Sequence, residues 1–273
     1  MERKLFCELG PWAYRISMEK MRLLRRWRNA KEHIHLAKTR QEEKLPVVIY
    51  RHNSLIRRKL GNVDMRLQEN KAVNLSLAAP KITGIVIHPG ETFSFWELVG
   101  PTSAKKGYKE GLTIAKGRTK SGIGGGMCQM TNLIHWMVLH SPLTITEHHH
   151  HDQMDLFPDF GRQIPFGTGT SIVYNYLDYR FLNATDQDFQ LIIWTDDTYL
   201  RGELRSTKPL PMKYHIHAEN ERFVEENGIV YREGQVIRRC VDVETGNTVF
   251  SQCIRDNHAQ VYYDTSHLEI QKK

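Results

Sequence analysis

The sequence has few cysteines and no long apolar segment. Its four cysteines, Cys7, Cys128, Cys240 and Cys253, include no Cys-x-x-Cys pair, which argues against a zinc ribbon and against a dense disulfide framework. A bridge between Cys240 and Cys253 across a hairpin stays open. Residues 1–10 lack the continuous apolar stretch of a signal peptide, and no run of 18 apolar residues predicts a transmembrane helix. We therefore expect a cytoplasmic protein.

Positive charge is concentrated at the beginning of the chain. The whole chain carries a net +7, and residues 1–60 contain 16 Lys and Arg against 6 Asp and Glu, which leaves −3 for the remainder. Such a segment is typical of a solvated basic helix or of a contact with anionic lipid or a phosphate-rich precursor. We expect no nucleic-acid partner, because no zinc-finger spacing, recognition-helix pattern or aromatic RNA-binding motif accompanies the charge.

Two helices are predicted before the central part of the chain. Apolar residues recur near a 3.6-residue period over residues 14–35, with arginines and a lysine on the other faces. This helix could pack on the body of the protein or lie on an anionic membrane surface, at the inner face of the membrane. A second helix is expected at residues 65–79, which end before Pro80.

A third helix is predicted from Cys128 to His140, where Pro142 stops it. Its apolar residues fall at i, i+3, i+4, i+7 and i+8, which is typical of one buried stripe; these are Met130, Leu133, Ile134, Met137 and Val138. We expect it to be central and buried.

The rest of the chain reads mainly as strands. A short strand is expected at residues 47–50 and another at 85–87, and alternating stretches follow at 172–176, 189–194 and 236–241. Turn residues at 183–186, 195–197 and 244–247 separate such stretches and predict consecutive antiparallel hairpins. The fold class is therefore α+β. We expect a basic, mainly helical segment at residues 1–60, a central domain at 61–206 and a C-terminal β-hairpin extension at 207–273.

The segment Gly124-Gly125-Gly126-Met127-Cys128-Gln129 places a thiol in the first turn of the central helix. Free N–H groups and the positive end of the helix dipole favour an anion there, which lowers the pKa of a thiol, and the same N–H groups can receive an oxyanion. Glycines lack a Cβ, so a substrate backbone could approach closely. Cys128 is thus a candidate nucleophile; the alternative is a small buried hydrophobe.

Four histidines, His148 to His151, follow a strand expected at residues 143–146. The same order of cysteine on a helix and histidine on a strand is found in papain-like and NlpC-like thiol enzymes. Alternate residues of a strand point to opposite faces, so at most two of the four can face Cys128. The alternatives are a polar loop and a zinc site that includes Cys128. We expect no metal and no cofactor, because no separated second ligand pair stands out.

Two motifs resemble the VanW family, and the resemblance covers about residues 62–205. They are Asn74-Leu75-Ser76-Leu77-Ala78-Ala79 continued by Pro89-Gly90-Glu91-Thr92-Phe93-Ser94-Phe95-Trp96, and the Gly-Gly-Gly-Met-Cys-Gln segment. The resemblance implies a link to the bacterial cell wall and to glycopeptide resistance. For some members it implies L,D-transpeptidase activity through the cysteine, which here is Cys128.

The resemblance also implies site residues. His151 corresponds best to the family's histidine and would be the base. The expected oxyanion or substrate contacts are Gly124, Gly125, Gly126, Gln129, Thr131, Asn132 and Ser94. Where the family shows Gly-x-Asp-Ala-Thr, this chain has Gly167-Thr168-Gly169-Thr170-Ser171. Gly169 therefore replaces an acidic residue, for which Asp152 or Asp155 could substitute.

These residues lead to one hypothesis and two alternatives. The hypothesis is a cysteine-dependent acyltransferase that acts on peptidoglycan stem peptides or their precursors. The alternatives are a non-catalytic module that binds a cell-wall precursor and a metal-binding protein with histidine and cysteine ligands.

Overall fold

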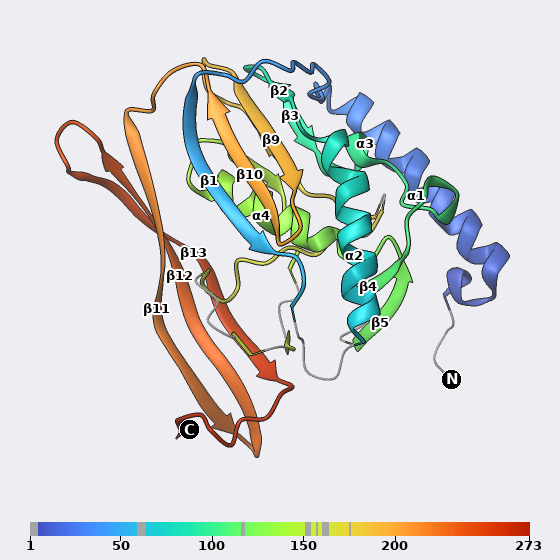
Figure 1. The fold of residues 1–273 in the computed structure, drawn as a ribbon. Helices are drawn as coiled ribbons and strands as arrows, with labels where there is room; N and C mark the ends of the chain where they lie inside the picture. Colours follow the sequence, from blue (N-terminus) through green and yellow to red (C-terminus); the bar gives the residue numbers. More distant parts are fainter. Residues whose placement is uncertain are drawn as a thin grey trace.

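The computed structural model describes residues 5–58, 64–115, 118–150, 154–156, 158–159, 164–174 and 176–273. Helices and mostly antiparallel strands confirm the α+β class (Figure 1). The α-helices are α1 (Pro11–Lys31), α2 (Met65–Ala78), α3 (Phe95–Val99) and α4 (Met127–Leu139). Three short 3₁₀ turns in the described residues are η1 (Phe6–Glu8), η2 (Ala79–Lys81) and η3 (Ala104–Lys106).

Three sheets surround the central helix. The largest of them contains, in spatial order, β1 (Val47–Leu55), β10 (Tyr199–Ser206), β9 (Phe189–Thr195) and β2 (Ile85–Ile87). The second contains β3 (Thr92–Ser94), β8 (Arg180–Leu182) and β6 (Thr144–Glu147), and the third is the hairpin of β4 (Glu110–Ala115) and β5 (Arg118–Ile123). Because β1 pairs with β10, the first sheet takes an edge strand from the basic N-terminal sixty residues.

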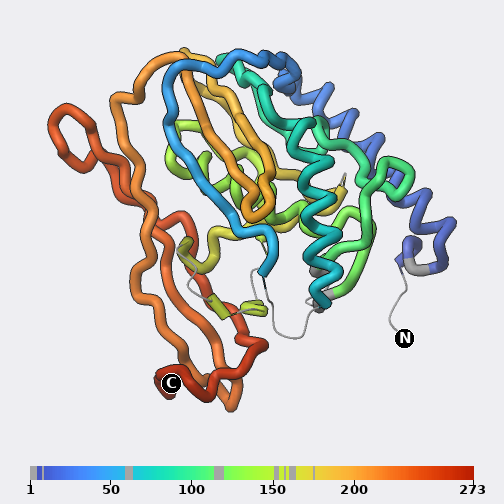
Figure 2. Tube along the Cα trace, viewed as in Figure 1, coloured from blue at the N-terminus to red at the C-terminus, as the bar shows by residue number. Residues whose placement is uncertain are grey.

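The C-terminal residues form a separate sheet. Its strands, in spatial order, are β14 (Ile270–Lys272), β11 (Met212–Glu226), β12 (Ile229–Asp242), β13 (Thr248–Val261) and β7 (Met154–Asp155). Figures 1 and 2 show β11–β13 as a long ribbon that stands beside the sheet of β1, β10 and β9. Arg238 of β12 joins the two parts by donating to the carbonyls of Leu139 and Ser141 at the end of α4.

The prediction of a central buried helix is confirmed. α4 lies behind β1 and β10 in Figure 1, and the side chains of Leu133 and Met137 lie against β10 at Gly202. A Cβ on Gly202 would come within 2.7 Å of both side chains, so the glycine lets the helix approach the sheet. Ten of the thirteen α4 residues are buried, which fits the broad apolar stripe in the sequence.

Two of the predicted hairpins are confirmed. β9 and β10 flank the turn at Asp196, and β12 and β13 flank the turn at Thr245. In the first turn the Asp196 carboxylate accepts the N–H groups of Thr198 and Tyr199, and in the second Asp242 accepts the N–H and hydroxyl of Thr245. Such side-chain to backbone bonds are the reason that Asp and Thr indicate turns.

One strand prediction and one hairpin prediction are wrong. The described residues of 172–176, which do not include Asn175, form only an isolated bridge, from Val173 to Leu177. Neighbouring backbone groups bind elsewhere, since the Ser171 N–H donates to the carbonyl of His149 at 2.6 Å. The turn at 183–186 does not close a hairpin either, since β8 pairs with β3 and β6 whereas β9 pairs with β10 and β2.

All four cysteines are free thiols. Cys240 on β12 is buried opposite Phe250, whereas the exposed Cys253 on β13 lies opposite Ile237. The two sulfurs therefore belong to different cross-strand pairs, and the bridge that the sequence left open is not formed.

Glu147, at the end of β6, attaches the N-terminal helix to the body. Its carboxylate accepts two hydrogen bonds from Arg25 of α1, at 2.5 and 2.8 Å, one from the Asp178 N–H at 2.8 Å and one from His149 at 3.1 Å. Burial by itself would raise the pKa of Glu147, but these partners outweigh it and lower the pKa to about 2.

No described helix combines the length and apolar composition needed to cross a bilayer.

Replacing the carboxylate tests this attachment. Glu147→Gln should lower the free energy of unfolding by about 1–3 kcal/mol, because it leaves Arg25 without its charged partner. The folded-state pKa lies below the usual value of 4.5, so the contribution of Glu147 is complete above that value and is lost as the pH falls toward about 2. Urea unfolding at pH 7 and at pH 3 measures both effects.

Glu19→Gln is the matched control. Glu19 also pairs with an arginine of α1, Arg22, but its side chain is 62% exposed, and exposed pairs contribute roughly 0–1 kcal/mol. Equal destabilisation by the two variants at pH 7 would contradict the role of Glu147.

Candidate functional site

The glycine turn Gly124-Gly125-Gly126 leads directly into α4. The φ angles of its first and third residues are 79° and 99°, a conformation that residues with a Cβ rarely adopt. A Cβ on Gly125 would lie 2.3 Å from the carbonyl carbon of Gly111 in β4, and one on Gly126 would lie 2.2 Å from Cγ of Lys71 in α2. The protein's own atoms thus fill the space on the Cβ side of these residues, so internal packing explains why they are glycines. Their contact with a substrate stays a prediction.

Asn74 of α2 fixes the position of this turn. Its side-chain amide is fully buried and donates to the carbonyls of Gly125 and Lys109, each at 2.9 Å, while its Oδ1 accepts the Lys109 N–H at 2.7 Å. Sequence reasoning placed Asn74 in a family motif without giving it a role. The sequence signal that could have identified Asn74 is a group of polar residues on the buried side of a helix. Gln68 and Lys71 of α2 are buried together with Asn74.

Cys128 lies in the first turn of α4 and is half-buried. Burial raises its pKa, and hydrogen bonds from the backbone N–H groups of Ile172 and of Cys128 itself lower it by less, so the pKa lies above the usual value. The expected low pKa is therefore wrong. The helix end does favour an anion, but the segment ending at Ile172 covers the sulfur and removes water from it.

Thr131 and Asn132 hold that covering segment. Asn132 Oδ1 accepts the N–H of Thr170 at 2.6 Å and its hydroxyl at 2.8 Å. The fully buried Thr131 hydroxyl bonds to the Thr170 hydroxyl and donates to the Cys128 carbonyl at 3.2 Å. In this structure both residues position the loop over Cys128, and the substrate contact expected from the sequence stays a prediction.

Two further expected substrate contacts are engaged in internal hydrogen bonds. Gln129 Nε2 donates to the Ser54 hydroxyl at 2.9 Å and to the Leu55 carbonyl at 2.8 Å, at the end of β1. Ser94 is 2% exposed, donates to the Asp178 carboxylate at 2.5 Å and caps α3. Ser94 is therefore enclosed and hydrogen-bonded within the protein, and its contact with a substrate stays a prediction.

The described histidines alternate as the sequence predicted. His148 Nε2 lies 2.9 Å from the Gly169 carbonyl oxygen, whereas His149 points to Glu147. The His148 ring stacks on His135 at a centroid distance of 4.3 Å, and His135 is seven residues beyond Cys128, which is about 10 Å along a helix. Among the described residues, no histidine ring is hydrogen-bonded to the Cys128 sulfur.

The proposed base and one of the candidate acids, His151 and Asp152, lie outside the described residues, so the role of His151 stays a prediction. The other candidate acid, Asp155, is engaged elsewhere. Its carboxylate accepts the Tyr263 hydroxyl at 2.8 Å and pairs with Arg232 at 3.3 Å on the C-terminal sheet. Asp155 therefore does not replace the missing aspartate.

Gly169 stands where the family aspartate was expected, directly beside the histidine cluster. A Cβ at this position would lie 3.4 Å from Nε2 of His150 and 3.9 Å from Oδ1 of Asn132. An acidic side chain there would reach the imidazole. This chain lacks that contact, so the described site contains a thiol and two N–H donors without an acid at position 169.

The metal alternative receives little support from the described residues. Among these residues, three possible metal ligands have their ligand atoms within 4.8 Å of one another: Glu226, Glu233 and His258. These residues lie on the C-terminal sheet and do not include Cys128. Glu233 is also paired with Lys273, so a cation of the protein already neutralises it.

Fold and site together define a class of α+β protein in which a packed glycine turn sets a cysteine at the start of a buried helix. The family model "VanW like protein" matches residues 70–205, which include this turn and the segment that covers the thiol. The chain is 34% identical over 227 residues, 83% of this chain and 82% of the relative, to the vancomycin B-type resistance protein VanW of Enterococcus faecalis. The chain belongs to the VanW family.

A second relative is the uncharacterized protein YoaR of Bacillus subtilis. It is 32% identical over 119 residues, which are 44% of this chain and 37% of the relative. No solved structure matched the chain. The protein is thus related to a vancomycin resistance protein, and neither relative's name states a reaction.

The burial of Cys128 predicts its reactivity in the folded protein. Alkylation of Cys128 by iodoacetamide should be slower at pH 7 than alkylation of the exposed Cys253, and its pH profile should inflect above about 8.5, the usual thiol pKa. Mass spectrometry of each cysteine peptide against pH measures this. An inflection well below that value would mean that the helix end outweighs burial.

Proposed function

We propose that the protein is a cysteine-dependent, L,D-transpeptidase-like acyltransferase that acts on peptidoglycan stem peptides or their precursors. The observation that carries this proposal is the position of Cys128 in the first turn of α4, where the backbone N–H of Ile172 also acts on the thiol and lowers its pKa against the effect of burial. Because the first N–H groups of an α-helix have no partner within the helix, this position favours a thiolate and could bind an oxyanion.

In the proposed reaction, the Cys128 sulfur attacks the carbonyl carbon of a stem-peptide bond. The sulfur–carbon bond forms, the carbon–nitrogen bond breaks, and the thiol proton passes through the base to the departing amine. An acceptor amine then takes the acyl group and the thiol is regenerated. Because burial raises the pKa of Cys128, a base is required, and His151 is the proposed one.

A non-catalytic module that binds a cell-wall precursor is the second candidate function. The replacement of the family aspartate by Gly169 favours it, because nothing at that position reaches the neighbouring His150. A thiol without an oriented base would bind a precursor and leave its bonds intact.

Adduct formation with a stem-peptide donor separates the two functions. Intact-mass spectrometry should detect an acyl adduct on the native protein and none on Cys128→Ser, because an unactivated hydroxyl replaces the thiol. His151→Ala should slow adduct formation by about 10²–10⁴-fold. Cys240→Ser, which removes another poorly accessible thiol, is the control and should form the adduct at the native rate.

The absence of an adduct on the native protein, together with retained binding of the donor, would support the binding module. If His151→Ala forms the adduct at the native rate and His149→Ala forms none, Cys128 remains the proposed nucleophile and His149 replaces His151 as the proposed base.

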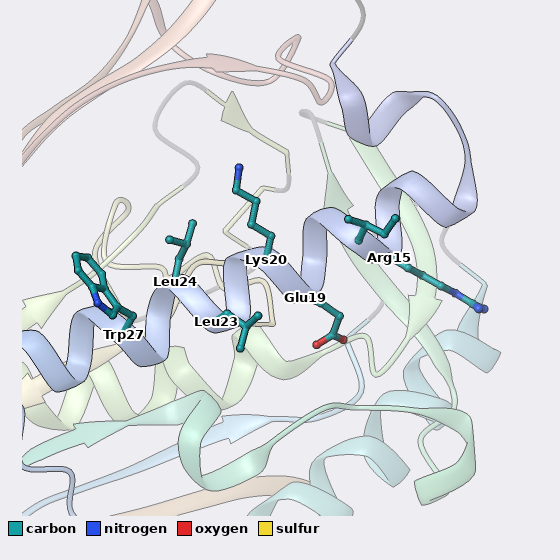
Figure 3. A pocket seen from close by; sticks show the side chains of 7 residues that line it. Arg15, Glu19, Lys20, Leu23, Leu24 and Trp27 are labelled. Carbon is teal, nitrogen blue, oxygen red and sulfur yellow. The ribbon is translucent and has the colours of Figure 1, made fainter.

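We propose further that the outer face of α1 rests on an anionic membrane surface, which would place the protein at the inner face of the membrane. The opposite face holds the body: Arg25 binds Glu147, and Asn29 accepts a hydrogen bond from Arg180 at 2.8 Å. The outer face therefore remains available. Figure 3 shows the side chains along it, with labels on Arg15, Glu19, Lys20, Leu23, Leu24 and Trp27.

Apolar and basic side chains are combined on this face. Leu23 is 64% and Trp27 is 59% exposed, and the same face includes Arg15 and Lys20. An aliphatic residue and a tryptophan can enter the headgroup region while basic residues meet lipid phosphates. The charge excess of residues 1–60 has the sign that an anionic surface attracts.

Vesicle binding tests the membrane proposal. The protein should bind phosphatidylglycerol vesicles more tightly than phosphatidylcholine vesicles, and the binding should weaken as salt is added. Leu23→Glu should reduce binding by about tenfold or more, since it removes an apolar anchor and adds a negative charge. Co-sedimentation with vesicles measures the affinities.

Val243→Glu is the matched control, because Val243 is 61% exposed but lies at the β12–β13 turn. Equal loss in the two variants, or equal binding to neutral and anionic vesicles, would reject α1 as the membrane contact.

A further inference from the structure

Lys71 of α2 is a largely buried lysine that has no charged partner among the described residues. Only 7% of its surface is exposed, and its side chain lies across Gly126, the N-cap residue of α4. Within the described part of the chain, its ammonium takes part in no hydrogen bond and no ion pair. Buried lysines are normally paired, because an isolated charge in a protein interior costs several kcal/mol.

The surroundings of Lys71 make the positive charge still less favourable. The N-terminus of α4 carries the positive end of the helix dipole, and Arg57 and Arg58 lie close enough to lower the pKa of Lys71. Arg57 is neutralised by Glu69, at 2.6 and 2.8 Å. For the guanidinium of Arg58, as for Lys71, no acidic partner is found among the described residues. Burial, reinforced by these two charges, lowers the pKa of Lys71 to about 7.

These observations share one explanation. A buried lysine, a second cation and a helix N-terminus of thirteen residues all favour a negative charge at the same place, and the described residues supply none. We propose that Lys71, Arg58 and the N-terminus of α4 form a binding site for an oxyanion, either a carboxylate or a phosphate. The ammonium and guanidinium would donate hydrogen bonds to the oxygens, and the helix end would contribute its positive potential.

The site adjoins Cys128, which lies two residues after Gly126. It would therefore hold the acidic end of the substrate that the thiol processes. A stem peptide offers a terminal carboxylate, and a lipid-linked precursor offers a phosphate. This last extension rests on the proposed function, whereas the oxyanion site itself follows from Lys71 and requires no reaction at Cys128.

Thermal unfolding of the full chain tests the site. The midpoint is measured at pH 6.5 in chloride, acetate and inorganic phosphate at constant ionic strength. At a concentration several times its dissociation constant, the bound anion should raise the midpoint by about 2–4 °C over chloride. Lys71→Met should abolish this increase. It should also be at least as stable as the native protein in chloride, because it removes a cation from a largely buried side chain while keeping an unbranched chain of similar length.

Lys81→Met is the matched control. Lys81 is another partly buried lysine, but its ammonium donates to the Val99 carbonyl at 3.1 Å and to the Tyr108 hydroxyl at 3.3 Å. Its replacement should lower the midpoint in chloride and leave the increase caused by the anion unchanged. Cys128→Ser should also retain that increase, which separates a failure of the anion site from a failure of the proposed chemistry.

The anion series identifies the ligand class. If the midpoint increases in acetate alone, and only while Lys71 is present, the ligand is a carboxylate. The same result in phosphate alone indicates a phosphate, and an increase in both anions supports a site that accepts either group. No increase over chloride in either anion, an equal increase in Lys71→Met, or a large loss of stability of Lys71→Met in chloride would overturn the proposal and make Lys71 a structural residue.

Discussion

The close contact between the backbones of Gly111 and Gly125 is the constraint on which the site depends. With a Cβ on either residue, atoms of the other would lie at 2.3–2.8 Å, well inside van der Waals contact, so both positions require glycine. The contact presses the β4–β5 hairpin against the turn before α4. Asn74 then fixes the same turn from α2 with a bond to the Gly125 carbonyl. The first turn of α4, and with it Cys128, is held by the contact between these backbones and by the buried Asn74 side chain.

The sequence predicted the helices and strands more accurately than the roles of individual residues in them. Periodicity identified α4 to within one residue at each end, because a buried stripe has to recur with the helical repeat. It could not show that the glycines before Cys128 pack against Gly111 and Lys71, since a Cβ-free position serves a substrate and a neighbouring strand equally well. Residues 172–176 were misjudged for a related reason: alternation predicts a strand only if the backbone is free to pair. Here the Ile172 N–H is directed at the Cys128 sulfur.

Glu147 and Lys71 differ in how far other residues of the chain neutralise their charges. Glu147 collects bonds from Arg25, His149 and the backbone of Asp178, so its charge is satisfied within the chain and links α1 to β6. Lys71 is also largely buried, and the part of the chain that the structure describes supplies no such group around it. Selection for stability alone would replace a lysine of this kind with an apolar residue of similar shape. Its presence beside a helix N-terminus is more easily explained by something that the protein binds.

The same comparison bears on Cys128. Its helix end and two N–H donors favour the thiolate, but burial prevails and keeps the proton on the sulfur. A nucleophile of this kind is generated only when a base takes the proton. The acid expected to orient a histidine is replaced by Gly169, where a Cβ would lie 3.4 Å from Nε2 of His150. If the protein is a catalyst, the orientation of the base must come from another group, and the substrate is one source of it. Until a base takes the proton, burial keeps the thiol protonated and unreactive.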